Sequence, residues 1–193
     1  MKKFISYGKN VYDKNEISAV TATLAKSTQM GKAVSKFEKK ISKLFGKKYG
    51  LMVNSGSSAL ILALKSLNLK AGSEIITPCL NFGTAVSSIM LNNLTPVLVD
   101  VDIRTLQINP NLIEKKITKK TKVIMPVHLT GRMCEMDKIN KIAKKYNISV
   151  IEDSAQSIMS GFKNKMSGSW GEVGCFSTHP LKNLNASGDG GFL

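Results

Sequence analysis

Apolar residues in the first 48 positions recur every three or four residues, the spacing of one face of an α-helix. One such stripe lies in residues 17–24 and a second in residues 37–44. From residue 50 onward, short apolar runs alternate with longer amphipathic ones. We therefore expect an N-terminal helical segment over residues 1–48, followed by a larger domain over residues 49–193.

Two pairs of polar residues predict where the N-terminal helices begin. Asp13 and Glu16 stand three positions apart ahead of the first stripe, as in a capping box, where each side chain bonds to a backbone N–H of the other residue. Ser35 and Glu38 repeat this spacing at the second stripe. Gly46 follows and should end that helix, because glycine readily adopts the left-handed conformation found at helix ends.

Beyond residue 50, strands and helices are expected to alternate. The predicted strands are 51–53 (short and buried), 74–77, 96–101, 122–128, 148–153 and 172–178, and the predicted helices are 57–67, 83–91, 111–117 and 135–146. This alternation favours an α/β fold with three layers (αβα) and a mostly parallel central sheet. Ligands of such folds bind at the carboxyl ends of the strands, so the segments that follow the strands should carry the chemistry.

The composition is that of an ordinary globular chain, with 193 residues, 42% of them hydrophobic and 21% charged. Cys79, Cys134 and Cys175 are unevenly spaced, which favours free buried thiols in a reducing compartment over disulfides or zinc ligands. No metal site is expected. The N-terminus lacks the apolar run of a signal peptide and no stretch is long enough for a membrane helix, so we expect a cytoplasmic location and no membrane partner.

A formal net charge of +15 is the unusual feature of the composition. Most lysines are spread over predicted helix faces, and residues 115–122 form the one dense cluster. Solvated helix faces therefore explain the charge better than a surface that binds nucleic acid. The alternative of a non-catalytic basic protein that binds nucleic acid stays open, and it predicts steeply salt-dependent binding to DNA.

Two polar segments lie between a predicted strand and a predicted helix in the first half of the domain. Residues 54–60 (NSGSSAL) place small residues with free N–H groups at a helix start, which can bind phosphate or simply cap the helix. Residues 77–85 (TPCLNFGTA) contain Phe82, which could cover a flat ring or belong to the core.

Two further segments follow strands in the second half. In residues 150–157 (VIEDSAQS), Asp153 ends an apolar strand and could pair with a cationic nitrogen, or could cap a helix. In residues 175–191 (CFSTHPLKNLNASGDGG), Lys182 follows a strand in a polar, glycine-rich stretch. Pyridoxal 5′-phosphate (PLP) requires a phosphate site, a ring clamp, an anion at its pyridine nitrogen, a donor to its ring oxygen and a lysine. Together the segments offer a candidate for each.

At these residues the sequence resembles the DegT-type (DegT/DnrJ/StrS) PLP-dependent sugar aminotransferases, which have the type I, aspartate aminotransferase-like fold. The resemblance extends over essentially the whole chain. It depends most on VIEDSAQS and GCFSTHPLKNLNASGDGG, in that order and at that separation, with support from PVLVDVD and PVHLTGRMCEMDKI.

The resemblance implies a role for individual residues. Lys182 would hold the cofactor, Asp153 would pair with its pyridine nitrogen, Gln156 would contact its 3-oxygen, Phe82 would stack on its ring, and Ser57, Ser58 and Ser177 would bind its phosphate. His128 and His179 match motif positions to which no role is assigned.

The implied activity is transfer of an amino group from an amino acid, with glutamate as the expected donor, to a nucleotide-linked keto sugar, for amino-sugar or surface polysaccharide synthesis. The full-length protein would act as a homodimer. A branch of the family uses the pyridoxamine form for sugar dehydration and has histidine in place of the lysine. Lys182 therefore favours amino transfer, and dehydration is kept as an alternative.

Family members continue into further strands and a smaller C-terminal domain, whereas this chain ends at Leu193, apparently within a strand. We therefore expect a truncated large domain. In isolation it should have uncovered sheet edges, poor solubility, weak cofactor binding and little activity. Soluble, active protein with a PLP absorbance band would contradict this expectation.

Overall fold

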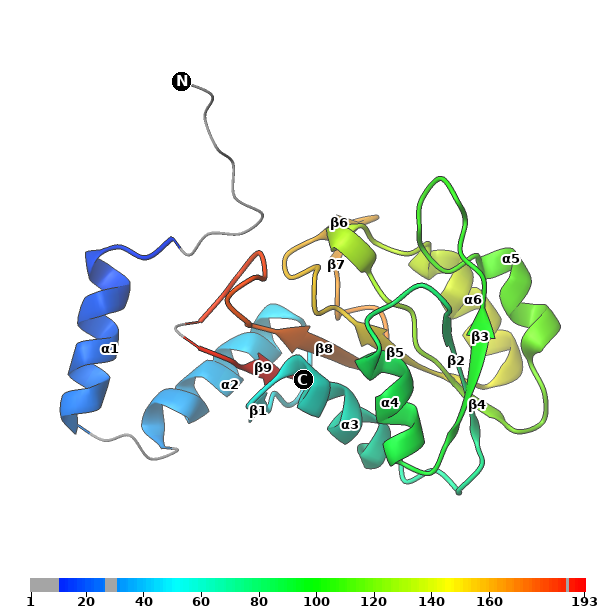
Figure 1. Ribbon diagram of the computed structural model, residues 1–193, viewed down its shortest axis with the longest axis horizontal. Helices are drawn as coiled ribbons and strands as arrows, with labels where there is room; N and C mark the ends of the chain where they lie inside the picture. Colours follow the sequence, from blue (N-terminus) through cyan, green and yellow to red (C-terminus); the bar gives the residue numbers. More distant parts are fainter. Residues whose placement is uncertain (1–10, 27–30, 187) are drawn as a thin grey trace.

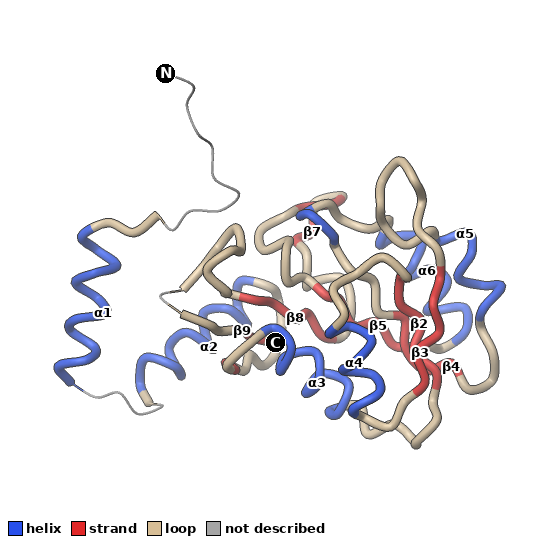
Figure 2. The backbone as a smooth tube through the Cα atoms, in the orientation of Figure 1, coloured by secondary structure: helices blue, strands red, loops and turns tan. Residues whose placement is uncertain are grey.

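The computed structural model describes residues 11–26, 31–186 and 188–193. Within them, a twisted seven-stranded sheet lies between helices (Figures 1 and 2). The strands of this sheet are β1 (Met52–Val53), β2 (Glu74–Pro78), β3 (Thr95–Val99), β4 (Thr121–Ile124), β5 (Ser149–Asp153), β8 (Val173–Ser177) and β9 (Gly191–Phe192). A separate hairpin consists of β6 (Gly161–Phe162) and β7 (Lys165–Met166).

The helices are α1 (Lys14–Lys26), α2 (Lys32–Leu44), α3 (Gly56–Ser66), α4 (Thr84–Leu91), α5 (Pro110–Ile113) and α6 (Met136–Tyr146), with short 3₁₀ turns at Glu114–Lys116 and Leu129–Gly131. Each element predicted beyond residue 50 is present, with ends that differ by a few residues. The largest difference is in β4, which ends at Ile124 because Pro126 cannot donate a ladder hydrogen bond.

The strand order is β1-β9-β8-β5-β4-β2-β3. The pairs from β3 across to β8 are parallel, whereas β9 is antiparallel to both β8 and β1. This confirms the mostly parallel sheet and the three-layer αβα fold. All parallel strands end at the same edge of the sheet, which is where the predicted chemistry should gather.

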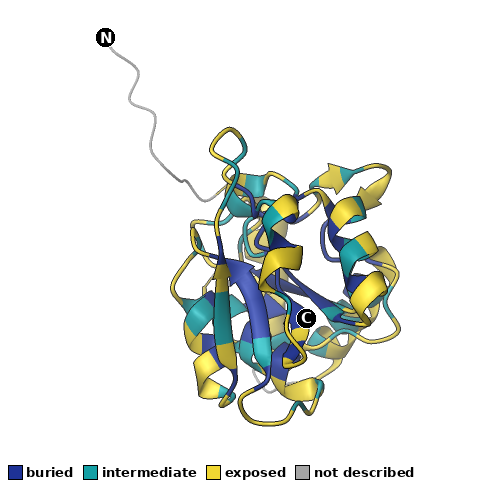
Figure 3. Cartoon of the chain, turned by 90° about the vertical axis from the view of Figure 1, so that its right-hand side faces the viewer, coloured by how far each residue is buried: buried dark blue, intermediate teal, exposed yellow. Residues whose placement is uncertain are grey.

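Alternate residues of the strands face two separate cores, as the two-residue period of a strand requires. Ile75 and Ile151 pack with the buried faces of α3 and α4 on one side. Ile76 and Val150 pack with α5 and α6 on the other. Figure 3 shows the buried strands in dark blue, covered by helices whose outer faces are exposed.

A third core joins α2 to the end of the sheet that holds β8 and β9. Phe45 lies 4.5 Å from Phe176 between ring centroids, and Phe176 lies 4.5 Å from Phe192 in a stacked arrangement. Ile41 is buried in the same cluster. Aromatic contacts of this kind stabilise the packing beyond the apolar area that they bury, and they attach α2 firmly to the domain.

The N-terminal capping predictions have different outcomes. The N–H of Asp13 donates to Glu16 Oε2 at 2.8 Å, so this half of the capping box is present at the start of α1. The second capping box is wrong: α2 begins at Lys32, and Glu38 instead accepts the N–H of Met52 at 2.9 Å. Gly46 has a φ of +65° just beyond the end of α2, as predicted.

Helix α1 differs from the other helices because no residue of it is buried. Its apolar stripe of Ile17, Val20 and Leu24 is exposed, and Figure 1 shows the helix standing apart from the sheet. Among the described residues, no helix has the length and apolar character needed to cross a membrane.

One expectation about the sheet needs correction: the strand at 51–53 is only partly buried, because β1 lies at an edge of the sheet. The strand expected near residue 193 is present as β9, and it is internal. It lies between β1 and β8, and Leu193 exchanges two backbone hydrogen bonds with Leu51, at 2.8 and 3.1 Å.

Candidate functional site

A pocket of about 560 Å³ opens at the carboxyl ends of β5 and β8, beside the first turn of α3. Six of the seven predicted site residues line it, namely Ser57, Phe82, Asp153, Gln156, Ser177 and Lys182, and so do both histidines, His128 and His179. A second, apolar cavity of about 350 Å³ beside α2 contains none of them. Segments more than 100 residues apart in the sequence thus meet at one site, which is the edge that the parallel sheet predicts.

The first turn of α3 forms one wall of the pocket, very close to β8. A Cβ placed on Gly56 would lie 2.8 Å from Ser177 Cβ, so only glycine permits this approach. Ser55 caps the helix by accepting the N–H of Ser58 at 3.1 Å. The N–H groups of Gly56 and Ser57 have no acceptor among the described residues. Free N–H groups at a helix start, together with the Ser57 and Ser177 hydroxyls, are donors of the kind that bind an anion.

Ser58 is the predicted site residue that the structure does not place in the pocket. Its hydroxyl donates to Asn54 Oδ1 at 2.6 Å and lies 3.1 Å from Ser55 Oγ. The side chain therefore takes part in capping α3, while Ser57, one position earlier, faces the pocket.

Asp153 ends β5 with its side chain in the pocket and only 5% exposed. Burial raises the pKa of this carboxyl group, since the charged form loses its water. The N–H of Ala155, at 3.1 Å from Oδ1, and the charge of Lys182 offset part of this rise. The carboxylate therefore has too few hydrogen-bond and charge partners to compensate its burial, and it is suited to bind a cationic group of a ligand.

Lys182 and Phe82 line the pocket from the segments that follow β8 and β2. The N–H of Lys182 donates to the carbonyl of His179 at 2.8 Å, which forms a turn, and the side chain is half-buried. Phe82 is 70% exposed although it lines the pocket, so its ring is free to cover a planar ligand. Gln156 also lines the pocket, and its Oε1 accepts the N–H of Thr130 at 2.7 Å.

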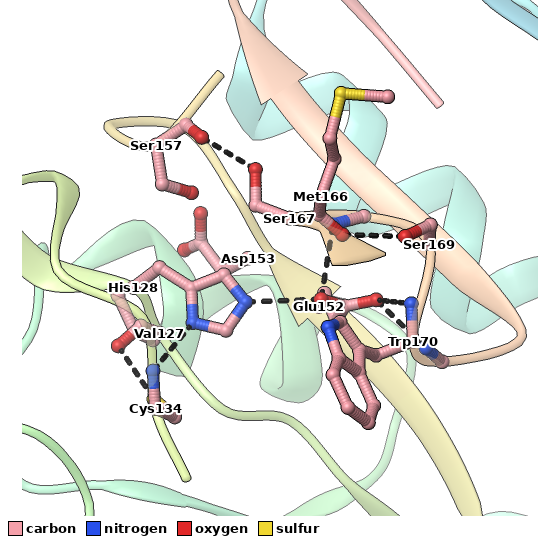
Figure 4. Close-up of polar contacts among 12 residues, drawn as sticks. Val127, His128, Cys134, Glu152, Asp153, Ser157, Met166, Ser167, Ser169 and Trp170 are labelled. Carbon is pink, nitrogen blue, oxygen red and sulfur yellow. Dashed lines mark hydrogen bonds and ion pairs between the residues drawn. The ribbon is translucent and has the colours of Figure 1, made fainter. Parts of the chain in front are cut away.

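Directly behind Asp153, Glu152 is the centre of a buried polar cluster (Figure 4). Both Glu152 and His128 have fully buried side chains, and Nε2 of His128 lies 3.0 Å from Oε2 of Glu152. Because Nδ1 of His128 accepts the N–H of Cys134 at 3.2 Å, the ring is neutral with its proton on Nε2.

Three backbone N–H groups complete the contacts of Glu152. They come from Gly168 at 2.9 Å and from Trp170 and Gly171 at 2.7 Å each. Burial by itself would raise the pKa of Glu152, but the hydrogen bonds from His128 and from the loop outweigh it and lower the pKa. The cluster thus ties β5 to the loop 167–171 and to the segment that follows β4.

Sequence reasoning missed the support around the pocket. The structural role of His128 was not assigned, and Glu152, Thr130 and Gln107 were not considered. A signal was present for Glu152, because a carboxylate inside a strand of buried apolar residues must be paired. No comparable signal exists for Thr130, whose left-handed backbone, with φ 56°, is a tertiary effect.

Comparisons with known proteins agree with this geometry. A model of the DegT/DnrJ/EryC1/StrS aminotransferase family matches residues 10–193. The spore coat polysaccharide biosynthesis protein SpsC of Bacillus subtilis is 38% identical over 191 residues, which are 98% of this chain and 49% of that protein. The dTDP-3-amino-3,6-dideoxy-alpha-D-galactopyranose transaminase of Aneurinibacillus thermoaerophilus is 45% identical over 77% of this chain and 41% of that protein.

Solved structures show the same likeness. The aminotransferase from Psychrobacter cryohalolentis superimposes with a TM-score of 0.89 at 34% identity, over 94% of this chain and 47% of that one. The E. coli GDP-4-keto-6-deoxy-D-mannose-3-dehydratase with bound hydrated PLP gives a TM-score of 0.91 at 32% identity, over 97% and 50%. The chain spans about half the length of the relatives it matches. By its sequence and its fold, this chain belongs to the DegT/DnrJ/EryC1/StrS aminotransferase family.

Proposed function

We propose that the chain is the cofactor-binding part of a PLP-dependent aminotransferase that acts on a nucleotide-linked keto sugar. The observation that carries this proposal is the meeting of Asp153 and Lys182 in one pocket with the free N–H groups and hydroxyls at the start of α3. A buried acid, a half-buried lysine and an anion site are the three fixed points that a pyridine ring with a phosphate tail requires.

The chemistry of the groups that line the pocket supports this proposal. The close approach of Gly56 to Ser177 leaves donors of two elements facing the same space, where they would hold a phosphate. The carboxylate of Asp153 would pair with the protonated pyridine nitrogen, which is the cation that this under-compensated acid lacks. Phe82 would cover the ring, and the amide of Gln156 would donate to its 3-oxygen.

When bound, the cofactor supplies an electron sink that stabilises negative charge at the carbon from which a proton is removed. The residues of the chain control the protons. Lys182 would bind the cofactor until an amino donor displaces it, and its freed amine would then move a proton between the donor and the cofactor as general base and acid. Asp153, held in place by β5, would keep the pyridine nitrogen protonated throughout.

Several finer features belong to the proposal. Two of the relatives named above have a nucleotide-linked sugar in their names, namely the dTDP-sugar transaminase and the GDP-sugar dehydratase. We extend this substrate class to the present chain, with glutamate as the amino donor. We also propose a homodimer, because the exposed apolar stripe of α1 is the kind of surface that association covers.

Sugar dehydration is the second candidate, since a dehydratase is among the structures with a similar fold. Lys182 favours amino transfer over this candidate, because a lysine amine can hold the cofactor covalently and also transfer the proton. Product analysis separates the two: an aminotransferase consumes the amino donor in a fixed ratio to amino sugar formed, whereas a dehydratase releases a deoxy sugar.

The experiment that tests cofactor binding is an absorbance titration of the purified chain with excess PLP. The excess of PLP offsets the weak binding expected of the isolated chain, so we expect a band near roughly 420 nm, the signature of PLP bound to a lysine, that is lost in Lys182→Ala. Lys163→Ala, at an exposed lysine paired with Asp137, is the matched control and should keep the band. A band that persists in Lys182→Ala would overturn the proposal.

A further inference from the structure

The amide of Gln156 is held in one orientation by the backbone of a neighbouring loop. Its Oε1 accepts the N–H of Thr130 at 2.7 Å. The oxygen of the amide is therefore engaged, and the NH₂ group at its other end is the part available to the pocket that Gln156 lines. Where Thr130 places its N–H thus decides whether Gln156 offers a donor or an acceptor to a ligand.

Thr130 makes this contact in a conformation that it would not adopt on its own. Its φ of 56° and ψ of 22° are left-handed, a conformation that a residue with a branched side chain rarely adopts. Gly131 follows with a φ of +81°, and a Cβ there would lie 3.2 Å from the carbonyl oxygen of Gln156. The loop Leu129–Gly131 therefore packs closely against Gln156. Because its backbone conformation is unfavourable, other contacts must stabilise it.

Gln107, in the loop after β3, provides these stabilising contacts. Its Nε2 donates to the carbonyl of Leu129 at 3.1 Å, and its Oε1 accepts the N–H of Leu129 at 3.2 Å. The same Nε2 lies 3.3 Å from the carbonyl of Thr105, and the same Oε1 accepts from Cys134 Sγ at 3.4 Å. Both ends of the amide are engaged by groups of fixed polarity, so its orientation is determined.

Gln107 has no contact with the pocket, and it is only 4% exposed. A buried amide that fixes both backbone groups of Leu129 leaves the next residue, Thr130, little freedom. We propose that Gln107 is a positioning residue for the cofactor pocket, which acts through Leu129 and Thr130 to hold Gln156 with its donor end toward the ligand. This inference rests on the proposed function, because it gives Gln156 the 3-oxygen of PLP as its target.

The first test needs no cofactor. In Gln107→Met, which keeps the length of the side chain and removes its donors and acceptors, amide hydrogen exchange of Thr130 should be about tenfold faster. Thr121→Val is the control: it removes a hydroxyl that donates to Glu74 at 3.0 Å at the opposite end of β4, and should leave Thr130 unchanged. Unaltered protection of Thr130 in Gln107→Met would overturn the inference, whether or not the chain binds PLP.

The second test measures coupling with PLP as the probe. Gln107→Met and Gln156→Met should each weaken PLP binding about tenfold, and the double variant should bind no worse than either one, because they remove the same donor. Each variant should also raise, by about one pH unit, the pH at which the visible band is half lost. The reason is that the 3-oxygen, without its donor, holds the proton on the Lys182 nitrogen more strongly.

The outcomes separate the two proposals. A double variant that binds PLP about a hundredfold more weakly, the product of the two single effects, would show that Gln107 acts independently of Gln156. That result would overturn the inference. A wild-type chain without any PLP band would contradict the proposed function. The hydrogen-exchange test of Thr130 would still decide whether Gln107 positions the loop. Where Gln107→Met fails to fold, Gln107→Glu takes its place. That variant keeps the acceptor for Leu129 N–H but loses the donor to its carbonyl, so the same directions are expected.

Discussion

Glu152 and Asp153 are adjacent in β5, and their carboxyl groups face opposite environments. Within the described residues, Glu152 accepts hydrogen bonds from His128 and from three backbone N–H groups, whereas the Asp153 side chain accepts one, from Ala155. Burial raises the pKa of Asp153, while the hydrogen bonds of Glu152 outweigh its burial and lower its pKa. One acid thus stabilises the fold, and its neighbour is left to bind a ligand.

Replacing Glu152 by glutamine should destabilise the chain strongly. Each oxygen of the carboxylate faces two donors, so the NH₂ of a glutamine would confront N–H groups at one end. We expect Glu152→Gln to lose about 2–4 kcal/mol of unfolding free energy, as in other buried networks that lose one partner. Urea unfolding at neutral pH measures this, and a loss under about 0.5 kcal/mol would contradict the structure.

Replacing Asp153 by asparagine should have the opposite effect on the cofactor-free chain. Asparagine keeps the oxygen that accepts from Ala155 and removes a poorly compensated charge. We expect Asp153→Asn to raise the Tm at neutral pH by about 2–4 °C, the shift that ~1 kcal/mol produces in a domain of this size. PLP binding should be lost at the same time. A lower Tm than wild type in the absence of PLP would refute this reading of Asp153.

The two acids also predict opposite contributions to the pH dependence of stability. Because the folded-state pKa of Asp153 is raised, its ionisation destabilises the fold progressively as pH rises from the ordinary aspartate value of about 3.9 through the folded value. The folded-state pKa of Glu152 is lowered, so its contribution is complete above the ordinary glutamate value of about 4.3 and is lost as pH falls through the folded value. Unfolding of wild type and Asp153→Asn at pH 3 to 8 measures this, and the advantage of the variant should grow toward neutral pH.

Gly56 is expected to be essential for the anion site. A methyl group there would meet Ser177 Cβ at 2.8 Å and force α3 away from β8. We expect Gly56→Ala to weaken binding of PLP, and of inorganic phosphate as its competitor, about tenfold or more, the effect of losing a hydrogen bond to a charged group. Gly161→Ala, whose nearest neighbour would lie 3.9 Å away, is the control and should bind normally.

The exposed face of α2 carries Lys32, Lys36, Lys39, Lys40 and Lys43. Lysines at i and i+4 repel one another, so this face costs stability at low salt. Replacing Lys36 by glutamate should create pairs with the lysines at 32, 39 and 40 and stabilise the chain by about 0.5–1 kcal/mol. Thermal unfolding at low and high salt tests this, since the gain should shrink as salt screens the charges. An equal gain at both salt levels would contradict the electrostatic explanation.

The strand and helix order was predictable because the periodicity of apolar residues is strong in the domain. What escaped prediction depends on contacts between distant segments. Glu38 resembles the end of a capping box, yet its carboxylate bonds to Met52. A strand was expected at residues near 193, but its position between β1 and β8 depends on pairing with two distant segments.

The site shows the same division. Asp153 and Lys182 could be named because they lie at, or just after, the carboxyl end of a predicted strand, where ligands of parallel sheets bind. Gln156 and Ser177 could be named through the family resemblance. Ser58 could not be separated from Ser57 by sequence, because which hydroxyl faces the pocket depends on the first turn of α3. Gln107 lies far from the site in sequence, and its function depends on the path of the loop after β4.

The most direct test of the proposed function is chemical identification of the lysine that holds PLP. The chain is incubated with PLP, treated with borohydride to reduce the lysine–cofactor linkage to a stable amine, and digested for peptide mass mapping. We predict that the label lies on Lys182 and is abolished when Asp153 is replaced by asparagine. A label scattered over the exposed lysines of α2, or absent from Lys182, would contradict the proposal.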